Sequence, residues 1–210
     1  MSYATESIEK YLADAAADQP APGGGSVSAL AGALAASMGE MAANFTLGRK
    51  KFEDVQQEVA NCRRRLTLCR RQLLILMDAD VTAYSAVSAA YGMPKETGAE
   101  KAARDGAVQA ALREAASVPL NTMRQCGAVT ETAARLVKIA NPNLLTDLAV
   151  SAILAKASCA AARINVEINL QHIKDDPFTG AVRAEMDGLT QTVARCQEEV
   201  TRTVQARLAK

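Results

Sequence analysis

Three consecutive glycines stand directly before the most apolar stretch of the chain, in the segment QPAPGGGSVSALAGALAASMGEMAANFTLGRKKF at residues 19–52. The turn that they form comprises Pro22, Gly23, Gly24, Gly25 and Ser26. A helix N-terminus offers free backbone N–H groups and a positive dipole end, which attract negative charge or a carbonyl oxygen. Because glycine has no Cβ, a ligand can approach such a backbone closely. The turn is therefore either a ligand site or an ordinary loop in which Ser26 caps the next helix.

A basic cluster ends the same apolar stretch, where Arg49, Lys50 and Lys51 follow Gly48. Cations at a helix C-terminus complement the helix dipole, so the cluster can be explained as a helix stop. The same cations could instead hold the carboxylates of an acidic ligand. The residues alone leave both explanations open.

Two aspartates, Asp78 and Asp80, interrupt the apolar run LLILMDADVTAY and project to different faces of a helix. A carboxylate placed between Met77, Val81 and Tyr84 would be partly desolvated. Its pKa would rise toward the range that is useful for acid–base chemistry. The aspartates could equally mark the solvated face of the helix.

Asn165 and Asn169 are four residues apart in another apolar helix, where amides are poor helix formers. If buried, each amide needs hydrogen-bond partners, from a neighbouring helix or from a polar heterocycle. Asp147, in the first turn of the same helix, can be explained by the helix dipole alone. His172, near its end, is expected at the surface or as a capping residue.

Composition excludes several classes of site. His172 is the single histidine, and the five cysteines are widely spread without a C-x-x-C pair, so we expect no metal site and reduced thiols in a cytoplasmic protein. The net charge of +1 gives no reason to expect nucleic acid or an anionic membrane as a partner. Residues 27–47 are long enough to span a membrane, but they are mainly Ala, Gly and Ser with Glu40 among them. We therefore expect a buried helix and no membrane contact.

The elements that position these groups are all expected to be helices, because apolar residues recur at helical spacing and no segment alternates with period two. The expected helices cover residues 7–17, 26–47, 53–91, 99–117, 120–139 and 144–173. After a break at DDPFTG, a last amphipathic helix is expected to continue to the C-terminus. Pro119 is expected to separate the fourth from the fifth. The pattern predicts an all-α, multihelical bundle that forms a single domain over residues 1–210.

Helices 26–47 and 144–173 are apolar nearly all round and are expected to be long central helices. In the first of them, Gly32 with Ala36 and Gly39 with Ala43 place small residues on neighbouring turns, which lets another backbone come close. Faces of this kind often continue across a subunit boundary, so a homodimer is expected.

Several segments taken together resemble one family of folate enzymes. They are PAPGGGSVSALAGALAASMGEMAANFTLGRKKF, MDADVTAYSAV, YGMPK with EKAAR and VPL, and ANPNLLTDLAV with INVEINL. The chain is similar, over nearly its whole length and in the same order, to the cyclodeaminase/cyclohydrolase family. That family includes the C-terminal domain of formiminotransferase-cyclodeaminase and free-standing methenyltetrahydrofolate cyclohydrolases. The resemblance implies an all-helical dimer that acts on a tetrahydrofolate derivative without a further cofactor.

The resemblance also implies roles for individual residues. The family's D-x-x-A-[FY] stretch matches the residues that begin at Asp80, which makes Asp80 the expected acid–base catalyst. Lys50 is expected to polarise the adduct oxygen or to hold the glutamate tail. The residues expected around the folate are Pro22, Gly23, Gly24, Gly25, Ser26, Asn44, Arg49, Asp147 and Asn165. The family usually has Gly-Asn where this chain has Ala140-Asn141, which puts in doubt any role that needs glycine at position 140.

The resemblance implies hydrolysis of 5,10-methenyltetrahydrofolate to 10-formyltetrahydrofolate as the reaction. The free-standing length and the segments YGMPKETGAEKAAR and AASVPL favour the cyclohydrolases. One alternative is the formiminotetrahydrofolate cyclodeaminase reaction, which releases ammonia. A second is a helical dimerisation module without activity, in which Asp80 and the two asparagines would be purely structural.

Overall fold

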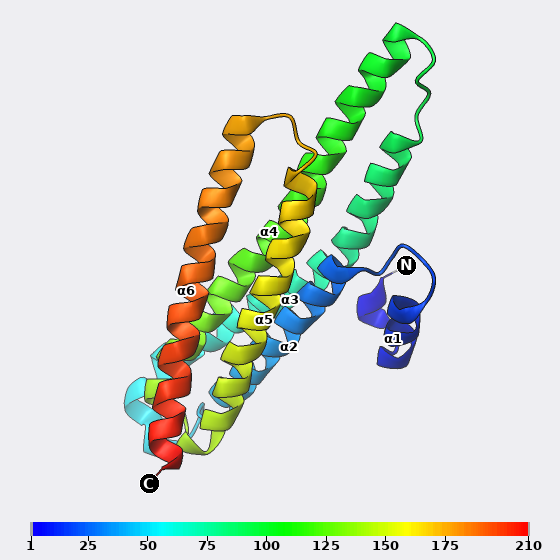
Figure 1. The fold of residues 1–210 in the computed structure, drawn as a ribbon. Helices are drawn as coiled ribbons and strands as arrows, with labels where there is room; N and C mark the ends of the chain where they lie inside the picture. Colours follow the sequence, from blue (N-terminus) through cyan, green and yellow to red (C-terminus); the bar gives the residue numbers. More distant parts are fainter. Residues whose placement is uncertain (1, 210) are drawn as a thin grey trace.

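The computed structural model describes residues 2–209, and every regular element in that range is helical. The helices are α1 (Ile8–Ala16), α2 (Gly24–Asn44), α3 (Gln56–Tyr91), α4 (Gly98–Ile139), α5 (Leu145–Leu170) and α6 (Asp176–Leu208), with 3-10 turns at Tyr3–Thr5, Lys50–Val55 and Pro142–Leu144. Figure 1 shows α2 to α6 as long rods lying side by side, with the short α1 set apart near the start of α2. The prediction of an all-α, multihelical bundle is confirmed.

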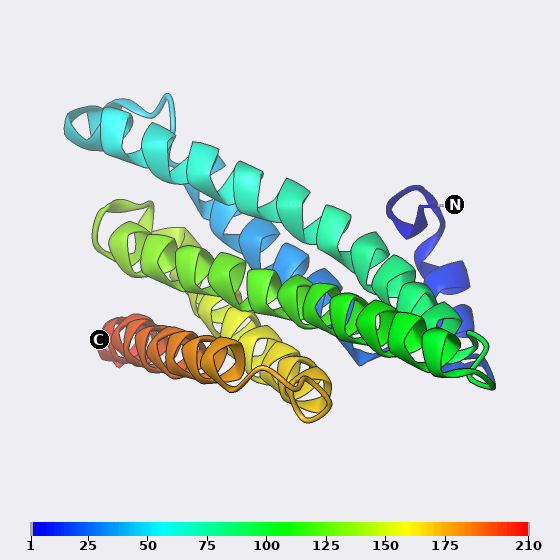
Figure 2. The same cartoon turned by 90° about the horizontal axis from the view of Figure 1, so that it is seen from above.

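Helices α2, α3, α5 and α6 are arranged around α4, which packs against all four of them. α2 lies between α3 and α5, and α6 covers α4 and α5 on the other side of the bundle (Figure 2). The three helices α3, α4 and α5 therefore form a groove, and α2 lies in it.

Small residues bring α2 and α5 close together. Ser158 donates a hydrogen bond to the carbonyl of Ser28 at 2.7 Å, and seven residues earlier Ser151 donates to the carbonyl of Ala35 at 2.7 Å. A Cβ on Gly32 would lie only 3.0 Å from the Ser158 Oγ. The small-residue spacing therefore predicts this close approach correctly.

The prediction that Pro119 separates two helices is wrong, because α4 continues through it from Gly98 to Ile139. Proline has no N–H to bond to the carbonyl four residues earlier, which is that of Ala115. The side chain of Asn169, on α5, donates to this carbonyl at 3.3 Å and also to the carbonyl of Asn165 at 2.8 Å. The neighbouring helix thus supplies the donor that the proline lacks.

We expect Asn169→Ala to lower the free energy of unfolding by about 1–2 kcal/mol, because the buried carbonyl of Ala115 loses its donor. Pro119→Ala restores a backbone N–H, so the cost of Asn169→Ala should shrink in that background. Urea unfolding of the wild type, both single variants and the double variant measures this coupling. Asn165→Ala is the matched control, since among residues 2–209 the Asn165 side chain donates only to the carbonyl of Ala161, within α5. Strictly additive losses for Asn169 and Pro119 would contradict the assignment.

Helix α2 begins at Gly24 and not at Ser26 as predicted. Gly23 is its N-cap residue and offers no side-chain cap, and the fully buried Ser26 lies in the first turn. The helix ends at Asn44, and Gly48 then turns the chain with a φ of 72°, in the left-handed region that favours glycine. The glycines are therefore part of the helix end itself.

The expected central position of α2 holds for one side only. Its inner residues are buried, but Leu34 at the midpoint of its outer side is 53% exposed.

Two segments, Lys50–Tyr91 and Pro142–Leu170, are long and apolar enough to cross a membrane, a test that core helices of bundles also pass. The helix expected to resemble a span, at residues 27–47, is not one of them.

All five cysteines are free and buried. Burial raises the pKa of the Cys126 thiol to about 12 and that of Cys159 to about 11. These thiols therefore pack as small apolar side chains, as their spacing predicts.

Candidate active site

A pocket of about 570 Å³ lies where α2 begins. Later residues of α3 and α5 line the pocket beyond Gly24, so the groove that α2 fills stays open past the first residue of α2. The lining residues are Pro20, Ala21, Gly23, Gly24 and Gly25 at the start of α2, Asp80, Ala83, Tyr84, Val87 and Tyr91 on α3, Leu112 and Ala115 on α4, and Asn165, Ile168, Asn169 and His172 on or just after α5.

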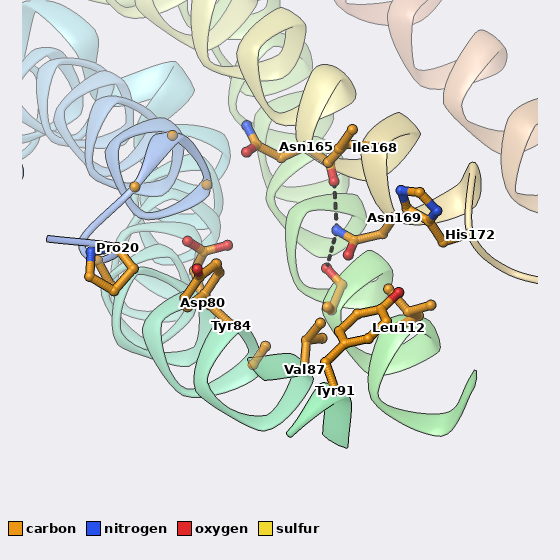
Figure 3. A pocket seen from close by; sticks show the side chains of 16 residues that line it. Pro20, Asp80, Tyr84, Val87, Tyr91, Leu112, Asn165, Ile168, Asn169 and His172 are labelled. Atoms are coloured by element: carbon orange, nitrogen blue, oxygen red, sulfur yellow. Dashed lines mark hydrogen bonds between the residues drawn. The ribbon is translucent and has the colours of Figure 1, made fainter. Parts of the chain in front are cut away.

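Asp80 lines this pocket and meets the first turn of α2 (Figure 3). Its Oδ2 accepts the backbone N–H of Ser26 at 2.9 Å. Helix ends normally satisfy such an N–H with a side chain at the N-cap, and Gly23 has none. Asp80 therefore caps α2 from the neighbouring helix α3.

Gly25 makes room for that carboxylate. A Cβ on Gly25 would lie 2.0 Å from the Oδ1 of Asp80 and 2.5 Å from its Cγ, so no other residue fits without a shift. A Cβ on Gly24 would lie 3.3 Å from the amide of Asn165, which faces the helix start from α5. The glycine turn thus brings polar groups of α3 and α5 against the same helix end.

The electrostatic setting of Asp80 suits proton transfer. Burial raises the pKa of Asp80 above its usual value, and the N–H of Ser26 acts in the opposite direction. Among residues 2–209, no Lys or Arg lines the pocket, so neither of these side chains holds the carboxylate ionised. A partly desolvated carboxylate of this kind can accept a proton from a reacting group and return it in a later step.

The two aspartates have different surroundings, in agreement with their predicted faces. Asp78 accepts hydrogen bonds from the hydroxyl of Ser2 and from the N–H of Tyr3, away from the pocket.

Behind Asp80, the buried hydroxyl of Tyr11 on α1 bonds to the hydroxyl of Ser26 at 2.9 Å. α1 is thereby attached to the turn that Asp80 caps.

Asn44, Arg49, Lys50 and Asp147 do not line this pocket and belong to the opposite end of α2. The 21 residues of α2 span about 30 Å at 1.5 Å per residue, and they separate the glycine turn from the basic cluster. The expectation that both ends of this helix form one pocket with Asp80 is therefore not met within one chain.

The end of α2 that carries the basic cluster is attached to the turn before α5. The hydroxyl of Thr46 accepts the N–H of Asn141 at 2.9 Å. Ala140 has ordinary extended backbone, with φ −76° and ψ 168°, so this position does not require glycine. Arg49 and Lys50 are exposed, and neither has an acidic partner within 4 Å among residues 2–209.

Sequence reasoning missed Tyr84, Tyr91, Ile168 and His172 as pocket residues. A signal was available on α3, because Asp80, Tyr84, Val87 and Tyr91 follow at i, i+4, i+7 and i+11 and so share one helix face. His172 is exposed, as expected, but it also lines the pocket.

Comparison of sequence and fold relates this chain to known proteins. The sequence profile of the formiminotransferase-cyclodeaminase family matches residues 7–188. A methenyltetrahydrofolate cyclohydrolase from Methylorubrum extorquens is 34% identical over 97% of this chain and 98% of its own length. A formimidoyltransferase-cyclodeaminase from Rattus norvegicus is 32% identical over 88% of this chain, which spans only 34% of that longer protein.

A crystal structure of formiminotetrahydrofolate cyclodeaminase from Thermotoga maritima superposes with a TM-score of 0.89 at 30% identity, covering 98% of both chains. Within residues 2–209, no three His, Cys, Asp or Glu side chains gather as metal ligands. The profile match, the full-length relatives and the helical architecture together show that this chain belongs to the formiminotransferase-cyclodeaminase family.

Proposed function

We propose that this protein hydrolyses 5,10-methenyltetrahydrofolate to 10-formyltetrahydrofolate. The observation that carries the proposal is the partly buried carboxylate of Asp80, held by the N–H of Ser26 at the wall of the pocket. The full-length similarity to a cyclohydrolase supports the choice of substrate.

The substrate is a bicyclic amidinium cation whose bridging carbon joins N5 and N10. In the first step water forms a C–O bond to that carbon, and its proton passes to the Asp80 carboxylate. In the second step the bond between N5 and the carbon breaks and Asp80 returns its proton to N5. The adduct hydroxyl releases its own proton to solvent as it becomes the C=O of the formyl group on N10. A positioned acid–base group of this kind contributes ~10²–10⁴ in rate.

The walls of the pocket suit a flat, partly polar ligand. Tyr84, Val87 and Ile168 offer apolar surface for ring systems, and the amide of Asn165 lies beside the first turn of α2. An anionic Asp80 also stabilises the cationic substrate before water adds. The mechanism as proposed uses no metal and no organic cofactor.

The cyclodeaminase reaction is a second candidate, favoured by the likeness to the Thermotoga maritima structure. That likeness covers 98% of both chains, so a free-standing length does not distinguish the two reactions. In the cyclodeaminase reaction N10 attacks the formimino carbon and ammonia leaves, which again requires proton transfer at the same position.

A parallel assay of both substrates tests the proposal. Purified protein is expected to remove the methenyl absorbance faster than buffer alone and to release no ammonia from 5-formiminotetrahydrofolate. Ammonia release without methenyl hydrolysis would assign the cyclodeaminase reaction instead. Neither activity, together with no thermal shift by tetrahydrofolate derivatives, would leave only the non-catalytic helical module.

We further propose that residues 1–210 act as a single catalytic domain, in the cytoplasm and as a homodimer. The five free, buried thiols favour a reducing compartment. The exposed apolar side of α2 favours self-association.

A further inference from the structure

The pocket is elongated in the direction of α3. Asp80 lies at its inner end, where it meets the first turn of α2, and Tyr91 lines it eleven residues further along the helix. At 1.5 Å per residue, these two residues are about 16 Å apart along α3. Tyr84 and Val87 lie between them on the same helix and line the pocket as well (Figure 3). Tyr91 therefore marks an outer end of the pocket, well away from the carboxylate.

A guanidinium group lies at this outer end. The Nε of Arg104, in the second turn of α4, donates to the carbonyl of Tyr91 at 3.2 Å, and its Cζ lies 5.6 Å from the centroid of the Tyr91 ring. Within residues 2–209, Arg104 has no carboxylate within 4 Å and its two Nη groups have no protein acceptor. Arg113 and Arg124, on the same helix, are each paired with a carboxylate. Arg104 is therefore held in place without being neutralised.

We propose that Arg104 binds the carboxylates of the folate's glutamate tail at the outer end of the pocket. The inference rests on the proposed function, because it places a part of the same substrate. Lys50, which the family resemblance suggested for the tail, belongs to the opposite end of α2 and does not line the pocket. The proposal assigns the role to a cation at the pocket's own end of the bundle.

The length of the substrate fits the distance along α3. Ordinary bond lengths place the γ-carboxylate of an extended aminobenzoyl-glutamate about 12 Å from N10. A guanidinium bonds a carboxylate at about 2.7–2.9 Å. The two lengths together come close to the spacing of about 16 Å between Asp80 and Tyr91. With its bridging carbon at Asp80, the substrate therefore brings its carboxylates to the level of Arg104.

The polarity of the walls orients the ligand in the same direction. At the inner end, the Asp80 carboxylate and the Asn165 amide suit the cationic bridge and the polar pterin, whereas Asp80 would repel a glutamate carboxylate. Tyr84 and Val87 then offer apolar surface for the aminobenzoyl ring. With its Nε already bonded, Arg104 presents both Nη groups, through which a guanidinium can bind the two oxygens of a carboxylate.

Two ligands that differ only in the glutamate test this subsite. They are 5-formyltetrahydrofolate and 5-formyltetrahydropteroate, and calorimetry measures their affinities. Arg104→Gln should weaken binding of the folate about tenfold, as expected for the loss of one charge-assisted hydrogen bond, and should leave binding of the pteroate unchanged. An equal effect on both ligands overturns the proposal, because the arginine would then act only through Tyr91 and the shape of the pocket.

Arg113→Gln is the matched control. Arg113 lies nine residues further along α4, which places it on the opposite face of the helix. Its Cζ likewise lies over an aromatic ring, 5.7 Å from that of Phe178, but it pairs with Asp175 and does not line the pocket. Arg113→Gln should leave both affinities at their wild-type values, and circular dichroism should show that both variants are folded. A loss of folate affinity alone in this control would mean that any cation of α4 has the same effect, which overturns the specific role of Arg104.

The basic cluster at the other end of α2 is the competing position for the tail. The same two ligands are therefore measured with Arg49→Gln/Lys50→Gln. A loss that is selective for the folate in this variant and absent in Arg104→Gln would place the tail at the cluster and overturn the proposal.

Kinetics and binding together separate this inference from the proposed function. Arg104→Gln should raise KM for 5,10-methenyltetrahydrofolate about tenfold with a much smaller change in kcat, because the tail is remote from the reacting carbon. Binding needs no turnover, so a selective loss of folate affinity in a protein that hydrolyses nothing would reject the function and keep the subsite. An active wild type whose Arg104→Gln variant shows no such selectivity would do the reverse, and a wild type that binds neither ligand would reject both.

Discussion

Asp80→Asn is expected to lower turnover by at least ~10²–10⁴ while leaving the fold intact. An amide cannot accept the proton of the attacking water, but its Oδ1 can still accept the N–H of Ser26 that Asp80 accepts now. The rate of methenyl hydrolysis measures the loss of turnover, and circular dichroism shows whether the fold is intact. Wild-type activity should also rise with pH through the raised pKa of Asp80, since the base must be ionised. A variant that retains wild-type turnover would remove Asp80 from the mechanism.

The same substitution is expected to stabilise the protein at alkaline pH. The pKa of Asp80 is raised on folding, so its contribution to stability is fully present below the unfolded pKa and is lost as the pH rises through the folded value. Asparagine carries no charge to desolvate and avoids that loss. Melting temperatures of Asp80→Asn should therefore exceed those of the wild type at pH 8 and approach them at acid pH. A lower melting temperature at pH 8 would mean that the bond to Ser26 outweighs burial.

Gly25→Ala is expected to remove activity as strongly as the loss of the carboxylate. The new Cβ would lie 2.0–2.5 Å from atoms of Asp80, so either the carboxylate or the helix start must move. We also expect the free energy of unfolding to fall by about 1–3 kcal/mol, the usual cost of overpacking. Turnover and urea unfolding measure both effects.

Two further variants identify the cause of that loss. Gly106→Ala is the matched control, because a Cβ there meets nothing within 4 Å and alanine is the better helix former. Asp80→Ala removes the atoms that the Gly25→Ala methyl group would meet, so the stability cost of Gly25→Ala should shrink in that background. An equal cost in both backgrounds would show that the glycine is needed for another reason.

Most of the fold could be predicted from the sequence, because hydrophobic periodicity and helix-breaking residues determine helices locally. The error at Pro119 has a non-local cause, since the donor that lets α4 continue comes from Asn169 on α5. The start of α2 was misplaced for a related reason. Its capping group is Asp80, 54 residues further along the chain, and no local pattern marks a cap supplied by another helix.

The candidate site was predictable in part. The glycines before an apolar helix indicated that the N-terminal end of this helix borders the pocket. The residues alone did not distinguish Asp80 from Asp78 as the catalyst, and the family resemblance made that choice. Lys50 and the glycine turn belong to the same sequence motif, but the full length of α2 separates them in one chain. A shared motif therefore does not place two residues in the same pocket. The tyrosines at 84 and 91 were missed although helical spacing from Asp80 marks their face.

The pocket exists because α2 stops short of the helices that flank it. Its depth is therefore set by an offset between helix ends, and much less by the bulk of individual side chains. One added turn before Gly24 would extend α2 by about 5.4 Å into this space. Among related chains, the number of residues between α1 and α2 should accordingly track the size of the accepted ligand, so that insertions or deletions change selectivity more abruptly than point substitutions do.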